Sequence, residues 1–102
     1  MTDNPPSTEQ SPSQPPMKVA TNSSVTAVAG AIAGKIREGH TVEMHAIGVG
    51  AIYQAVKAIA TAQLFLQEDD IAIATMMSFI DLIIDDKERT GIQFQVWRKQ
   101  PG

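Results

Sequence analysis

The stretch "HAIGVGAIYQAVKAIA", residues 45–60, joins an apolar segment to a helical pattern through two glycines, Gly48 and Gly50. Glycines at such a junction let a backbone approach a phosphate closely, and they also permit a tight turn between a strand and a helix. A dinucleotide-binding turn requires G-x-G-x-x-G, but Tyr53 stands where the third glycine belongs. The junction therefore favours a strand-to-helix turn, whose free N–H groups offer one weak contact to a phosphate.

A long helix is predicted directly after this turn, over residues 51–66. Apolar side chains recur at helical spacing around most of its circumference, interrupted only by Tyr53, Gln54, Lys57 and Thr61. A helix with so little polar surface is usually buried on several sides. We therefore expect this helix to be covered on more than one side.

The segment upstream predicts a strand followed by a helix. Residues 17–21, "MKVAT", are short and apolar, and Ser23 or Ser24 is placed to cap the helix that follows. Apolar residues recur at helical spacing from Val25 onward, and Gly39 is a typical residue for the end of this helix.

Three further segments show the features of β-strands and a turn. Residues 41–48 alternate between apolar and polar side chains, which predicts a half-buried strand. Residues 71–84 are apolar on both faces, so we expect a strand that is buried or lies at an interface. Residues 85–91 predict a polar hairpin turn, and residues 92–99 alternate strictly, with Trp97 on the outward, exposed side.

The predicted order of elements, βαβαββ, defines the fold class. A strand–helix–strand step is normally a right-handed crossover between parallel strands, whereas the last two strands are expected to form an antiparallel hairpin. The sequence thus predicts a two-layer α+β sandwich, with a four-stranded mixed sheet and both helices on one face.

One domain and one tail account for the 102 residues. Residues 1–16 contain five of the six prolines and almost nothing apolar, which predicts a disordered tail, and residues 17–100 form the domain. The chain has no cysteine, no secretory signal and no apolar run of the roughly 18 residues that a membrane span needs. We expect a cytoplasmic protein without a membrane partner.

The charge balance disfavours strong binding to duplex nucleic acid. The chain carries 8 basic and 11 acidic residues, a net charge of -3. Asp3 and Glu9 lie in the tail, so the domain itself is near neutral. Proteins that coat DNA usually have a basic excess clustered on one face.

No constellation of side chains predicts catalysis or a metal site. His40 and His45 do not have a ligand spacing and no cysteine assists them, and we expect His45 on the open sheet face beside Glu43. The acidic residues cluster in turn-like segments. Asp81 alone interrupts an apolar strand, where it lies on the solvent side or pairs with Arg89. We expect no enzyme activity, cofactor, metal or small-molecule substrate.

Three segments together resemble one known family. They are "KVATNSSVTAVAGAIAGKIREG", "AIGVGAIYQAVKAIATAQLFL" and "DKERTGIQFQV", and they span residues 17 to about 98. In this order they closely resemble the stage V sporulation protein S family, which looks like a relative of the Alba chromatin proteins. The resemblance implies the same βαβαββ fold, dimerisation, binding of DNA or RNA, and a regulatory role in sporulation.

The resemblance also implies where nucleic acid would bind. Alba-type proteins use the loop after the first strand, a segment before the second helix and a long β-hairpin, and the matching hairpin here is predicted to be short. The loop has no lysine, the segment 47–50 has no arginine, and acidic neighbours offset the hairpin cations, so weak, backbone-directed binding is expected. Bases of a single strand would stack on Tyr53 or Trp97. The expected contact residues are Lys18, Thr21, Asn22, Ser23, Ser24, Gly48, Gly50, Lys57, Lys87 and Arg89.

Two hypotheses of different kinds follow. One is an Alba-like regulator that binds RNA or DNA as a homodimer or higher oligomer. The alternative is a homo-oligomeric protein-interaction module that has kept the fold and lost the ligand. The near-neutral domain, the apolar strand 71–84 and the outward Trp97 favour this second hypothesis, since exposed apolar surface usually marks an interface.

Overall fold

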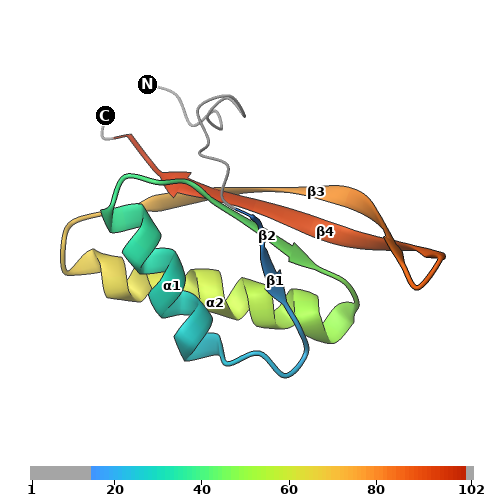
Figure 1. Ribbon diagram of the computed structural model, residues 1–102. Coiled ribbons are helices and arrows are strands. Elements are labelled where there is room, and N and C mark those ends of the chain that lie inside the picture. Colours follow the sequence, from blue (N-terminus) through green and yellow to red (C-terminus); the bar gives the residue numbers. More distant parts are fainter. Residues whose placement is uncertain (1–14, 101–102) are drawn as a thin grey trace.

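The computed structural model describes residues 15–100, and its elements follow the predicted order. They are β1 (Met17–Val19), α1 (Val25–Arg37), β2 (Val42–Ala46), α2 (Val49–Gln67), β3 (Ile73–Ile84) and β4 (Lys87–Arg98). The strands form one sheet in the order β1-β2-β4-β3, in which only β1 and β2 are parallel. Both helices lie on the same side of this sheet (Figure 1), which confirms the two-layer α+β sandwich. Most of the predicted tail lies outside the described residues.

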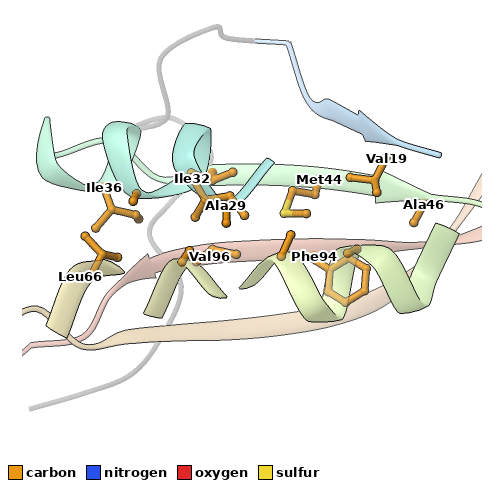
Figure 2. Close-up of a cluster of buried hydrophobic side chains, with 14 of the residues drawn as sticks. Val19, Ala29, Ile32, Ile36, Met44, Ala46, Leu66, Phe94 and Val96 are labelled. Atoms are coloured by element: carbon orange, nitrogen blue, oxygen red, sulfur yellow. The ribbon is translucent and has the colours of Figure 1, made fainter. Parts of the chain in front are cut away.

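The hydrophobic core fills the space between the helices and the central strands. The alternation predicted for β2 and for the inner part of β4 is confirmed, because Val42, Met44 and Ala46 of β2 and Phe94 and Val96 of β4 are buried in the core. Figure 2 shows strand and helix side chains meeting in this cluster. The largest fully buried side chains are Phe94, Ile32, Ile36, Met44, Leu66 and Val96.

Helix α1 begins and ends at the predicted signals. Ser24 is the N-cap residue, and its hydroxyl accepts a hydrogen bond from the Ala27 N–H at 3.2 Å. The last helical residue is Arg37, and Gly39 follows with a φ of +89°, a left-handed conformation that glycine adopts without strain.

The hairpin formed by β3 and β4 is long, so the prediction of a short hairpin with a turn over residues 85–91 is wrong. Each strand has 12 residues, and the register runs without interruption from Ile73 opposite Arg98 to Ile84 opposite Lys87. Asp85 and Asp86 alone make the turn, with φ of 53° and 64°, as in the two-residue turns that match strand twist. The polar composition of residues 87–91 reflected exposure to solvent and not a turn conformation.

Part of this hairpin extends beyond the sheet. Strand β2 pairs with β4 only from Ile92 to Val96, so residues 80–91 project as a two-stranded ribbon (Figure 1). We call residues 80–91 the hairpin arm. No strand flanks the arm, and its residues 83–90 are all exposed.

Strand β3 is an outer edge of the sheet, and much of it is exposed. The helices cover β2 and the inner part of β4, which leaves the helix-side residues Met77, Phe79 and Ile83 exposed to 58%, 79% and 75%. The sequence predicted that β3 is either buried or part of an interface. Within this single chain β3 is not buried, so its apolar pattern favours an interface.

Trp97 lies on the outward face of the sheet as predicted, but only 8% of its surface is exposed, so the prediction that it is exposed is wrong. It lies opposite Ala74 on the face of the sheet without helices, and it is outside the main core cluster. Alternation predicts the face that carries a side chain, but not how far its neighbours cover it. Trp97 therefore offers no free ring for stacking.

Helix α2 packs against both α1 and the sheet, so the prediction that it is covered on more than one side is confirmed. Its fully buried residues form one stripe, and Ile52, Ile59 and Phe65 are partly buried beside it. The stripe consists of Ala51, Ala55, Ala58, Ala62 and Leu66. By length and composition this 19-residue helix is also apolar enough to cross a membrane, in contrast to the sequence expectation, but a core helix of a soluble domain passes the same test.

Candidate nucleic-acid interface

The hairpin arm separates its charges by face. Side chains directly opposite each other in an antiparallel pair lie on the same face, and successive residues alternate between faces. Arg89 lies opposite Leu82 and Lys87 opposite Ile84, on the face away from the helices, whereas Glu88 lies opposite Ile83 on the other face. The two cations of the arm therefore share one face with aliphatic side chains and not with Glu88.

Asp81 also lies on the face away from these cations. It is opposite Thr90, whose hydroxyl donates a hydrogen bond to Asp81 Oδ1 at 3.2 Å. The pairing of Asp81 with Arg89 that the sequence left open is therefore not formed. Asp85 and Asp86 form the turn at the end of the arm, next to Lys87 in sequence. The strand pairing does not place their carboxylates on either face.

Lys18 lies on the same face of the sheet as these cations, but on β1, the edge strand farthest from β3. It lies opposite His45 in the β1–β2 pair, while its neighbours Met17 and Val19 point toward the helices. His45 Nε2 is 2.7 Å from Glu43 Oε2, so the predicted position of His45 beside Glu43 on the open face is confirmed. This pair leaves the ammonium of Lys18 available.

We call the side of the sheet without helices the uncovered face. It carries Lys18, Lys87 and Arg89, none of which forms an ion pair with another residue between 15 and 100. A set of unpaired cations on one face is the electrostatic pattern that phosphate groups bind. The strand residues of this face carry three cations against one carboxylate, that of Glu43, so the face is more basic than the composition of the domain suggested.

The loop after β1 is held in place by its own serines. The Ser23 hydroxyl accepts a hydrogen bond from the Ala20 N–H at 2.8 Å, and the Ser23 carbonyl accepts one from Gln54 at 2.9 Å. Ser24 caps α1. These two serines therefore shape the loop, whereas the side chains of Thr21 and Asn22 are exposed.

The glycine junction is explained by steric and conformational needs. Gly48 is the N-cap residue of α2 and has a φ of +93°, which disfavours any residue with a side chain. A Cβ at Gly50 would lie 2.9 Å from the Thr21 side chain, so a glycine is needed where the β1–α1 loop meets α2. The junction brings Thr21, Gly48 and Gly50 together, and its contact to a phosphate stays a prediction.

Lys57 lies apart from the other predicted contact residues. It is two turns into α2, with its ammonium 4.3 Å from the centre of the Tyr53 ring. Helix α2 belongs to the helical layer (Figure 1), whereas Lys18 lies on the face of the sheet without helices. Lys57 and Tyr53 therefore do not contribute to the uncovered face.

Within residues 15–100, no three acidic or histidine side chains are grouped so that they could hold a metal ion.

Two aliphatic residues of the uncovered face, Leu82 and Ile84, are not identified in the sequence analysis. The signal for them was the alternation that continues through residues 80–84 and 87–91 on either side of a two-residue turn.

The βαβαββ order, the four-stranded mixed sheet and the two helices on one face define an Alba-like α+β fold. The family model of stage V sporulation protein S matches residues 16–99, and the chain belongs to that family. The family is one of small regulatory proteins related to sporulation, and it is not known for enzymatic activity.

Proposed function

We propose that the protein is a small regulator that binds RNA or DNA weakly through the uncovered face. The observation that carries this proposal is the separation of charges on the hairpin arm. It places Lys87 and Arg89 on the same side as Lys18, with Glu88 and Asp81 on the other side. Phosphate contacts need no base-specific geometry, so such a face binds nucleic acid through its backbone.

The number of cations limits the affinity. Non-specific binding to nucleic acid is almost entirely electrostatic, and each neutralised phosphate contributes about 0.7 to 0.9 to the salt slope. Three cations provide few phosphate contacts, and Asp85 and Asp86 at the end of the arm repel the backbone. The binding is therefore in the weak range of roughly 10 to 100 micromolar at physiological salt.

The direct test is fluorescence anisotropy with labelled RNA and DNA oligonucleotides at low salt. The double variant Lys87→Glu/Arg89→Glu is expected to weaken binding more than tenfold, because two favourable contacts become repulsive (about 1.4 kcal/mol gives each factor of ten). Lys57→Glu is the matched control, since it makes the same type of charge reversal in the helical layer. Equal affinity of the double variant and the wild type would remove the uncovered face from the proposal.

A second candidate function is self-association, favoured by exposed apolar side chains on α2 and β3. We call this surface the apolar face. It comprises residues of α2 and of the helix side of β3: Val49, Tyr53, Val56, Met77, Phe79 and Ile83. The α2 members are exposed to 86%, 61% and 46%. An exposed apolar patch of this kind usually marks an interface between proteins.

The two parts of the apolar face belong to one surface. The Gln63 side chain donates to the Ile71 carbonyl and accepts from the Ile73 N–H, both at 2.9 Å, so this side of α2 faces β3. Val56 and Val49 lie 7 and 14 residues before Gln63, and a spacing of seven keeps them on the same side of the helix. A second copy of the chain would cover this face, and the uncovered face of each copy would remain free for nucleic acid.

A further inference from the structure

A cleft of about 380 Å³ opens beside the uncovered face, between β1 and the hairpin arm. One wall is formed by β1 and the residues after it, from Lys18 to Thr21, and the other by Leu82, Ile83 and Ile84. His45 and Ile47 complete the lining. The volume lies in the range of sites for small ligands, roughly 300 to 1,000 Å³.

The lining of the cleft is mostly apolar, with its polar groups on one side. Of these, the His45 imidazole is already engaged with Glu43 at 2.7 Å. The ammonium of Lys18 has no ion-pair partner within the described residues. The cleft thus combines an aliphatic slot with one available positive charge at its edge. Arg89, opposite Leu82, adds a second cation beside the arm wall.

We propose that this cleft takes one unstacked base of a single-stranded nucleic acid, with the neighbouring phosphate on Lys18. The inference rests on the proposed function and adds the class of nucleic acid to it. A base presents two apolar faces that aliphatic side chains such as Ile47 and Leu82 can hold, and its own phosphate lies within reach of a single cation. In a duplex the bases are paired and stacked, so they do not enter a slot of this kind.

The charges of the arm support the same choice. A duplex held only by its backbone requires many cations, because affinity grows with the number of phosphates neutralised. Among residues 15–100, the strands place three cations on the uncovered face, Lys18, Lys87 and Arg89. The carboxylate of Glu43 shares this face, and two aspartates stand at the end of the arm. Burial of a base adds affinity that does not depend on further cations. A single strand therefore gains affinity by placing a base in the cleft, whereas a duplex, whose bases are paired, does not.

The test uses the full chain with labelled isoleucine and leucine methyl groups, titrated with a short oligouridine and with an RNA duplex of equal length. Oligouridine is expected to shift the methyl signals of Ile47, Leu82 and Ile84, because a bound ring lies against them. The methyl signals of Leu64, an exposed leucine on α2, are expected not to move. The duplex is expected to bind more weakly and to leave the cleft signals unchanged.

Affinity measurements on variants complete the test. Leu82→Ala is expected to weaken oligouridine binding about tenfold (about 1.4 kcal/mol), because the base loses an aliphatic wall of the cleft. Ile84→Ala, at a 41% exposed position, is a second variant that leaves folding intact, and Leu64→Ala is the matched control. Unchanged affinity in both cleft variants, or equal binding of strand and duplex, overturns the base slot and leaves the proposed function standing. No binding to either oligonucleotide overturns both.

Discussion

The Thr90 hydroxyl donates a hydrogen bond to Asp81 Oδ1 across the hairpin arm, at 3.2 Å. This pairing places the only acidic side chain of β3 on the face opposite to Arg89. A register shifted by one residue would place Asp81 opposite Arg89, and its carboxylate would compete with a phosphate for that cation. The chemistry of the arm thus depends on the register of two strands more than on its composition.

The salt dependence of binding should report three phosphate contacts. For single-stranded RNA we expect log affinity to fall with log salt at a slope of roughly -2, or about 0.7 per neutralised phosphate. Arg89→Gln should make the slope shallower by about 0.7, because one contact is lost. The measurement is anisotropy over a range of salt concentrations. A slope that Arg89→Gln leaves unchanged would show that Arg89 does not contact the backbone.

Self-association through the apolar face should be sensitive to a charge at its most exposed aromatic residue. Phe79, exposed to 79%, is expected to be buried in a homodimer, so Phe79→Asp should yield a monomer. Light scattering coupled to size-exclusion chromatography measures the change. Ala31→Asp is the matched control, because Ala31 is exposed on α1 and is not part of the apolar face. A wild-type monomer at micromolar concentration would reject the self-association proposal.

Two glycine-to-alanine variants should change stability in opposite directions. A Cβ at Gly91 would lie 2.7 Å from the Ala46 carbonyl oxygen, a backbone atom, so Gly91→Ala should lower the free energy of unfolding by about 1 to 3 kcal/mol. Gly30 lies in α1 with open space around it, and Gly30→Ala should raise stability by about 0.5 to 1 kcal/mol. Chemical denaturation measures both. A neutral Gly91→Ala would contradict the close approach of β2 to β4.

The loop serines should contribute to stability and not to binding. Ser24→Ala removes the cap of α1 and should cost about 1 kcal/mol of folding free energy, with nucleic-acid affinity unchanged when the protein is folded. Asn22, exposed in the same loop, is the comparison, since Asn22→Glu should leave stability nearly unchanged and weaken binding by repulsion. Denaturation and anisotropy on the two variants separate the roles. Reduced affinity in folded Ser24→Ala would assign Ser24 a direct contact.

Local patterns predicted much of the fold because each depends on neighbours in sequence. The alternation of β2, the cap at Ser24 and the end of α1 at Gly39 all agree with the structure. The hairpin was misjudged because polar residues are common to turns and to exposed strands, and only pairing with residues 80–84 distinguishes the two. Trp97 was misjudged for a related reason, since exposure depends on residues distant in sequence.

The features of the candidate site also fall into two groups, those that follow from the sequence and those that require the tertiary structure. The sequence by itself determined the order of the elements, the buried face of each central strand, the family, and the need for small residues at 48 and 50. The tertiary structure alone decided that Lys18, Lys87 and Arg89 share one face, that Lys57 lies on the other layer, and that a cleft opens between β1 and the arm. The reason is physical: period and caps arise from residues a few positions apart, whereas a shared face arises from strand register over tens of residues.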